Sequence, residues 1–207
     1  MIEIGVMWFP RKRETFKDMQ KSIGVPFTVY PDGKEFKHET TAPVKYLGEH
    51  AGCFKHYYRV LEDLCKSDAE YVAVMSDDVL YAPKWCETAI SAMGEDVGFV
   101  ACYTPEGLRK RHNWSKGIQE IKGGWASSWG GAYLMKRDVA KKVLNHPYFI
   151  NHRDNYAKNQ QIDHALPNCI HLMGLKQLFL VPSLTDHIGL TSTIGHVHTH
   201  REKGAGW

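Results

Sequence analysis

Short apolar runs recur along the chain, at lengths typical of strands. Continuous or alternating apolar positions predict six strands, at Ile2–Phe9, Phe27–Tyr30, Tyr71–Met75, Val97–Tyr103, Ala132–Met135 and Gln177–Val181. Polar segments with helical spacing lie between several of these runs. Strands that alternate with helices predict an α/β fold, which we expect to form one domain over residues 1–207.

Helices are predicted where apolar positions recur three or four residues apart. In HAGCFKHYYRVLEDLC, one face carries Ala51, Phe54, Tyr57, Leu61 and Leu64. Local signals predict three further helix boundaries: Pro83 in the first turn of KWCETAISAM, Asp138 as the N-cap of VAKKVL, and Pro167 as the end of a short helix in KNQQIDHAL.

Two segments lack a clear period. Gly107–Gly124 is polar, basic and flanked by glycine, which predicts a mobile or substrate-facing loop. The stretch from His187 to Trp207 predicts an irregular tail that becomes ordered on binding.

Composition and charge narrow the class of protein only slightly. The formal charge of +3 is mild, and the basic runs PRKR, LRKRHNWSK and MKRDVAKK are, taken singly, typical of solvated surfaces. Five cysteines without a C-x-x-C pair favour reduced thiols and a cytoplasmic location. No apolar run reaches the length of a membrane span, and the start of the chain does not resemble a signal peptide.

The run YVAVMSDDVLY ends a central apolar strand with two adjacent acids. Ligands of α/β sheets gather at the carboxyl ends of strands, and Asp77 and Asp78 are expected there. Carboxylates suit a hard divalent cation that is bound together with phosphates. The alternative is that one aspartate caps the turn and the other is solvated, and the pair alone does not decide between the two.

The order of four motifs is similar to that of GT-A nucleotide-sugar glycosyltransferases. These motifs are MSDDV, SSWGGAYLM, NQQIDHAL and VPSLTDHIG. The first and last resemble the N-acetylglucosaminyltransferase IV-type enzymes and related bacterial or viral branches. The resemblance implies a Rossmann-like GT-A domain with a mixed, mostly parallel central sheet flanked by helices. It also implies a nucleotide-binding half, 1–103, and an acceptor half with the tail, 104–207.

The resemblance implies a Mn²⁺ or Mg²⁺ site. Asp78 matches the metal ligand of the D-x-D motif, and Asp77 would contact ribose or sugar hydroxyls. Ser76 stands where the family often has an acid, so the cation would depend on Asp78, a histidine and the diphosphate. His187 matches that histidine, and His196 is the second candidate for the same role. The alternatives are that His187 has a structural role and that His196 belongs to a polar tail.

The same resemblance implies a general base and a set of donor-binding residues, although these residues also have simpler structural explanations. Asp163 matches the general base of inverting members, whereas an ordinary helix-surface aspartate is the default reading. Donor contacts are expected from residues of the first loop, the helix at 51–64 and the glycine turn: Pro10, Arg11, Arg13, Lys55, Trp129, Gly130 and Gly131.

The acceptor is the least constrained part of the prediction. The loop 108–122 is basic and includes an aromatic residue, so it would suit a phosphate backbone and a displaced base. The predicted acceptor-binding residues are Arg109, Lys110, Arg111 and Trp114. A hydroxymethylated pyrimidine in phage-type DNA and a saccharide remain equally open as acceptors.

The sequence thus predicts a metal-dependent glycosyltransferase that moves a sugar from a nucleoside-diphosphate sugar, such as a UDP-sugar, to an acceptor hydroxyl. Two other classes remain open. A metal-dependent phosphohydrolase or nuclease would also use the aspartates and the late histidines. A binding module without catalytic activity would bind a nucleotide sugar or nucleic acid and turn nothing over.

Overall fold

The computed structural model describes residues 1–9, 15–33, 35–121, 132–155 and 162–188. Seven strands form one sheet in the order β2-β1-β3-β7-β5-β8-β6, and β4 pairs with β9 beside it. The strands are β1 (Ile2–Trp8), β2 (Thr28–Pro31), β3 (Tyr71–Ser76), β4 (Val79–Tyr81), β5 (Val97–Ala101), β6 (Gly117–Ile121), β7 (Tyr133–Lys136), β8 (Lys176–Val181) and β9 (Thr185–His187).

The strand directions make the sheet mixed and mostly parallel. β1 is parallel to β2 and β3, and β5 is parallel to β8. β7 lies antiparallel between β3 and β5, and β6 is antiparallel to β8 at the edge. Five strands therefore run in one direction, and their carboxyl ends share one edge of the sheet. All six predicted strands are present, with ends that differ by one or two residues.

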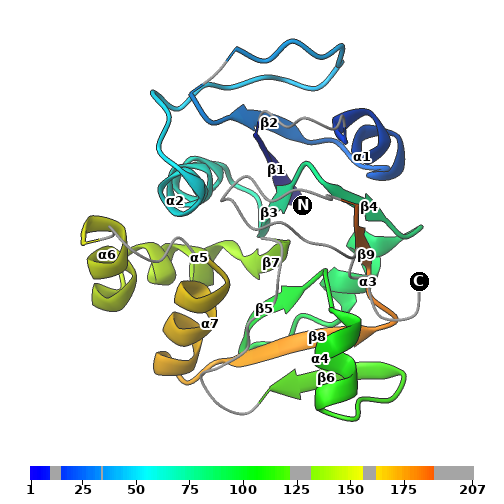
Figure 1. Cartoon of the computed structure of the whole chain (residues 1–207). Helices are drawn as coiled ribbons and strands as arrows, with labels where there is room; N and C mark the ends of the chain where they lie inside the picture. The colour runs from blue at the N-terminus through cyan, green and yellow to red at the C-terminus, as the bar shows by residue number, and fades with distance from the viewer. Residues whose placement is uncertain (10–14, 34, 122–131, 156–161, 189–207) are drawn as a thin grey trace.

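Helices cover both faces of this sheet (Figure 1). One apolar core packs α2, α5, α6 and α7 on the sheet, and a second core packs α1 and α3 on the opposite face. The helices are α1 (Phe16–Ser22), α2 (Cys53–Leu64), α3 (Trp85–Ser91), α4 (Glu106–Arg111), α5 (Arg137–Leu144), α6 (Pro147–Asp154) and α7 (Ile162–Leu172).

Residues 72–75 of strand β3 are apolar on both faces and do not alternate with polar residues. Val72 and Val74 belong to the first core, and Ala73 and Met75 belong to the second. Each face of the strand is therefore buried, as in other sheets with helices on both sides. The predicted α/β class, with a mixed sheet flanked by helices in one Rossmann-like domain, is confirmed.

Three predicted helix boundaries are wrong. Pro83 precedes the N-cap of α3, because Lys84 takes a left-handed conformation with φ 59° and the helix starts at Trp85. Asp138 lies within the first turn of α5, whose N-cap is Lys136. Pro167 does not end α7, which continues to Leu172.

Tertiary packing accounts for the continuation of α7 through Pro167. The proline removes one backbone hydrogen bond from the helix. The following turn is held by Cys169 and Ile170, which are fully buried. A Cβ atom on Gly98 of β5 would lie 2.3 Å from the Ile170 side chain, so the glycine allows this close approach.

The predicted loop at Gly107–Gly124 is largely regular structure in its described part. It contains most of α4 and all of β6, which pairs with β8. Glu106 and Arg109 face each other one helical turn apart and join the first and last turns of α4, with hydrogen bonds of 2.7 and 2.5 Å. The expectation of an irregular tail is wrong for His187, which ends β9.

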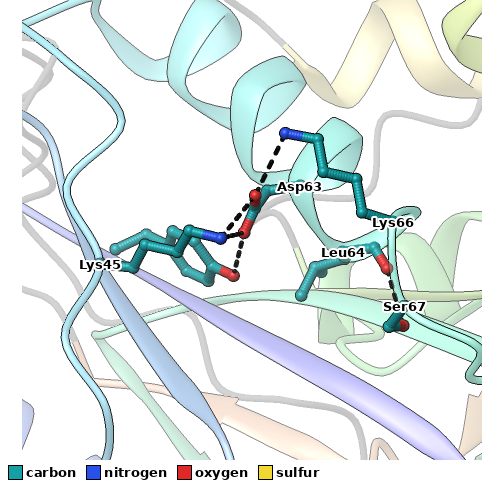
Figure 2. Close-up of polar contacts among 6 residues, drawn as sticks. Lys45, Asp63, Leu64, Lys66 and Ser67 are labelled. Carbon is teal, nitrogen blue, oxygen red and sulfur yellow. Dashed lines mark hydrogen bonds and ion pairs between the residues drawn. The ribbon is translucent and has the colours of Figure 1, made fainter.

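Asp63 on α2 binds side chains from strand β2 and from the loop that follows β2. Its carboxylate lies 2.7 Å from the Lys45 ammonium and accepts a 2.9 Å hydrogen bond from the Tyr30 hydroxyl of β2. Lys66 approaches the same group at 3.4 Å (Figure 2). Burial acts to raise the pKa of Asp63, but the hydrogen bonds from Lys45 and Tyr30 outweigh it and hold that pKa below its ordinary value.

Replacing Asp63 with asparagine therefore gives a pH-dependent loss of stability. Because the folded pKa is depressed, the carboxylate stabilises the fold fully above its unfolded pKa of about 3.9 and loses this contribution as the pH falls through the folded pKa. We expect Asp63→Asn to lower the free energy of unfolding by about 1–2 kcal/mol at pH 7 and by less at pH 3.

Urea unfolding of both proteins at the two pH values measures this difference. Asp68→Asn is the matched control, because the Asp68 side chain is fully exposed and lies 3.7 Å from Arg137. We expect it to change stability by less than about 0.5 kcal/mol. An equal loss for Asp63→Asn at both pH values would contradict the role of its charge.

Candidate functional site

The two aspartates of the MSDDV motif form the turn between β3 and β4. Ser76 is the last residue of β3, and the strand Val79–Tyr81 begins directly after the pair. Asp77 is 1% exposed and Asp78 is 5% exposed. The alternative in which one aspartate is solvated is therefore wrong, and burying such carboxylates is favourable only when they are paired or hydrogen-bonded.

Pairing of β4 with β9 brings His187 to Asp78. The two strands are antiparallel, with Val79 opposite His187, and the Ile188 N–H donates a 2.8 Å hydrogen bond to the Asp78 carbonyl. His187 Nε2 lies 3.0 Å from Asp78 Oδ2. The Ser76 hydroxyl donates to the other carboxylate oxygen, Oδ1. Three residues named by the sequence motifs thus form one connected cluster.

The end of β5 holds β9 in place. The Cys102 carbonyl accepts hydrogen bonds from the Thr185 N–H at 2.9 Å and from the Thr185 hydroxyl at 3.2 Å. The buried Ser183 hydroxyl accepts from the Thr104 N–H at 2.9 Å and donates to the Thr185 carbonyl at 2.7 Å. The Tyr103 ring lies 6.1 Å from the His187 ring. Backbone groups of residues 102–104, directly after β5, therefore fix the strand that carries His187.

Tyr81 places a protonated hydroxyl close to the acidic turn. Burial raises its pKa well above the ordinary value, and the charges of Cys102, Asp78 and Asp77 raise it further. Within the described residues, no group hydrogen-bonds to the buried Tyr81 hydroxyl. Sequence analysis missed both Tyr81 and Tyr103, because an aromatic residue in an apolar run is indistinguishable from a core residue.

Asp32 is a further buried acid at the same edge of the sheet, directly after β2. Its carboxylate accepts hydrogen bonds from the N–H groups of Ala51 at 2.8 Å and Gly52 at 3.1 Å. His50 Nδ1 lies 2.8 Å away. Asp32 therefore fixes the start of α2. Its position after a predicted strand is the one signal by which the sequence marks it.

Asp163 and Lys55 lie on helices of the first core. Asp163 is half-buried in the first turn of α7, and its charge contributes, after burial and Cys65, to the raised pKa of Tyr57 on α2. Lys55 is exposed on α2. The pKa of Asp154 on α6 is lowered mainly by Arg153, and the Lys55 charge lowers it further. The roles of general base and donor contact stay predictions.

Several predicted site residues lie outside the described residues. These are Pro10, Arg11, Arg13, Trp129, Gly130, Gly131 and His196.

The four predicted acceptor residues divide into two kinds. Arg109 forms two hydrogen bonds with Glu106, and the Trp114 ring packs against His112 at 5.0 Å and Phe179 at 5.4 Å. These two side chains help to build the corner between α4 and β6. Lys110 and Arg111 are exposed on the last turn of α4.

The described part of the chain holds no group of three or more His, Cys, Asp or Glu side chains arranged for a metal ion. Asp78 and His187 bring two possible metal ligands together, a carboxylate oxygen and an imidazole nitrogen. Helices long and apolar enough to cross a membrane are also absent among the described residues.

No model of a known protein family matches the chain, and no curated protein matches it. Among solved structures it is similar to the crystal structure of A197 from STIV, with a TM-score of 0.51 and 13% sequence identity. The match covers 89% of this chain and 83% of that chain. At this level of identity the likeness supports the fold alone.

The anchoring of β9 predicts a specific effect of Ser183→Ala. Without the hydroxyl, the buried Thr104 N–H loses its acceptor, which we expect to cost about 1–3 kcal/mol of unfolding free energy. Hydrogen exchange at the Ile188 N–H should also become faster, because β9 is held less firmly. Ser91→Ala removes an exposed hydroxyl bonded to the Thr88 carbonyl and serves as the control. Equal stability and exchange in both variants would contradict the role of Ser183.

Proposed function

We propose that the protein is a metal-dependent glycosyltransferase that uses a nucleoside-diphosphate sugar, with a UDP-sugar as the first candidate. One observation carries the proposal: Asp78 Oδ2 and His187 Nε2 lie 3.0 Å apart at the carboxyl end of β3. These are the residues that the resemblance to GT-A enzymes assigns to the metal. They are 109 residues apart in the chain, and the pairing of β4 with β9 brings them together.

The donor set of the pair fits a divalent cation. An imidazole nitrogen beside a carboxylate oxygen suits Mn²⁺, whereas Mg²⁺ prefers oxygen ligands. Asp78 and His187 would hold the ion, and the diphosphate oxygens of the donor would supply further ligands. When bound, such a cation neutralises negative charge that develops on a diphosphate leaving group.

Protein groups supply the other parts of the proposed reaction. An acceptor hydroxyl attacks C1 of the sugar, the bond from C1 to the diphosphate breaks, and the hydroxyl proton leaves. Asp163 is the proposed acceptor of that proton if configuration is inverted. If configuration is retained, Asp163 orients the acceptor instead. Asp77 is the proposed contact to ribose or sugar hydroxyls.

The competing functions differ in their products. A phosphohydrolase or nuclease would release phosphate or cut a phosphodiester without sugar transfer, and a binding module would release nothing. Two-ion hydrolysis needs several ligands around a pair of metals. Within the described residues, Asp78 and His187 bring together one carboxylate and one imidazole, which suit one ion, and this favours the glycosyltransferase over a two-ion hydrolase.

A panel of UDP-, GDP- and dTDP-sugars tests the proposal. We expect at least one donor to bind only when Mn²⁺ is present and to be hydrolysed slowly without acceptor. Asp78→Asn and His187→Gln should each weaken Mn²⁺-dependent donor binding by at least about 10-fold. Asp163→Asn should leave donor binding within about 2-fold and lower sugar transfer by about 100-fold or more.

Asp96→Asn is the matched control, because Asp96 is an exposed acid paired with Lys176 at 2.7 Å, before β5. It should bind donor as the wild type does. Binding of no nucleotide sugar in the presence of Mn²⁺ would overturn the proposal. Phosphate release from nucleotides, lost in Asp78→Asn and without any sugar transfer, would support the phosphohydrolase instead.

The proposed acceptor is a hydroxymethylated pyrimidine in DNA, and a saccharide is the alternative. Exposed Lys110 and Arg111 carry this part of the proposal, since each can contact one phosphate. Replacing both with serine should weaken binding to modified duplex DNA and reduce the slope of log K against log salt by about 1 per lost contact. The control is a second double variant in which serine replaces Lys141 and Lys142. Both lysines are exposed on α5, so this variant loses the same charge at a different surface.

Titrations of both double variants at several salt concentrations measure the effect. Equal salt slopes for the α4 and α5 variants would overturn the DNA proposal. Sugar transfer to saccharides alone would support the alternative acceptor.

A further inference from the structure

We infer that Ser76 is a positioning residue that sets the orientation in which the Asp78 carboxylate faces His187 and a bound cation. The inference rests on the proposed metal site and names a residue at which this chain departs from the acid often found in the resembled family. Ser76 is buried at the end of β3, and its hydroxyl donates a hydrogen bond to Asp78 Oδ1.

The two carboxylate oxygens of Asp78 have different partners. Oδ1 accepts the Ser76 hydroxyl, and Oδ2 lies 3.0 Å from His187 Nε2. A rotation of the carboxylate that moved Oδ2 away from His187 would also break the bond to Ser76. The serine therefore selects one orientation of the carboxylate and leaves one oxygen directed at the imidazole.

The backbone of Asp78 is held by contacts that do not involve the Ser76 hydroxyl. The Asp78 carbonyl accepts from the Ile188 N–H at 2.8 Å, and Val79 pairs with His187 in the β4–β9 ladder. Loss of the hydroxyl should therefore change the orientation of the carboxylate while the turn stays in place. This separates the positioning role from a general contribution to folding.

A serine also changes the charge of the site. An acid at position 76 would add a third acidic group beside the buried Asp77 and Asp78, with repulsion that a cation has to offset. The neutral hydroxyl orients Asp78 without that repulsion. A site with Ser76 can accordingly keep its geometry in the absence of metal, with the Asp78–His187 contact in place.

Binding of Mn²⁺ alone, followed by the loss of the EPR signal of the free ion, tests the inference. We expect Ser76→Ala to raise the dissociation constant for Mn²⁺ about 10-fold, as loss of a hydrogen bond to a metal ligand typically does. Ser76→Thr keeps a hydroxyl and should restore binding to within about 3-fold of the wild type. Thermal unfolding checks that each variant is folded.

Ser67→Ala is the matched control, because the Ser67 hydroxyl donates a 2.9 Å hydrogen bond to the Leu64 carbonyl at the end of α2 (Figure 2). It removes one serine hydroxyl without touching Asp78, and Mn²⁺ binding should not change. Wild-type affinity in Ser76→Ala, together with loss of binding in Asp78→Asn, would overturn the role of Ser76 and leave the metal site standing.

A second measurement decides the role of Ser76 without metal. In ¹⁵N NMR spectra of the metal-free protein, Ser76→Ala should move the resonance of His187 Nε2, whereas Ser76→Thr and Ser67→Ala should not. An unchanged His187 resonance in Ser76→Ala would overturn the inference. A wild-type protein that binds no Mn²⁺ would overturn the proposed metal site, and the NMR result would still decide whether Ser76 orients Asp78.

Discussion

The antiparallel contact between β4 and β9 is the constraint on which the candidate site depends. Each strand has three residues, yet their pairing sets Val79 opposite His187 and ties Ile188 to the Asp78 carbonyl. The Asp78–His187 contact exists because this register holds. The end of β5 stabilises the ladder in turn, through hydrogen bonds at the Cys102 carbonyl.

The same edge of the sheet collects buried polar groups that the two apolar cores exclude. Helices cover both faces, so the carboxyl ends of the strands are where an α/β sheet can receive a ligand. Buried polar residues lie at or shortly after the ends of β2, β3, β5 and β8, and in β9: Asp32, Ser76, Asp77, Asp78, Thr104, Ser183, Thr185 and Asp186. The divalent cation proposed above carries the charge that buried carboxylates at this edge would offset.

Sequence patterns anticipated the parts of this fold in which a long apolar run or a clear helical face decides the structure. Strand β3 and helix α2 are of this kind. The patterns failed where tertiary packing outweighs local preference, as at Pro167 in α7. They also missed β4 and β9, because three residues are too few to establish a period. The resemblance of the motifs predicted that Asp78 and His187 share one site. The hydrogen bond from Ser76 to Asp78 could not be predicted in this way, because it depends on side-chain geometry.

Asp78 and His187 are proposed to hold one divalent cation against the diphosphate of a sugar nucleotide. A crystal grown with Mn²⁺ and UDP, with diffraction recorded at the manganese absorption edge, would locate that cation. We expect one anomalous peak within coordinating distance of Asp78 Oδ2 and His187 Nε2, and in contact with the diphosphate. Bound UDP without a peak there, or with manganese bound elsewhere, would rule out this metal site.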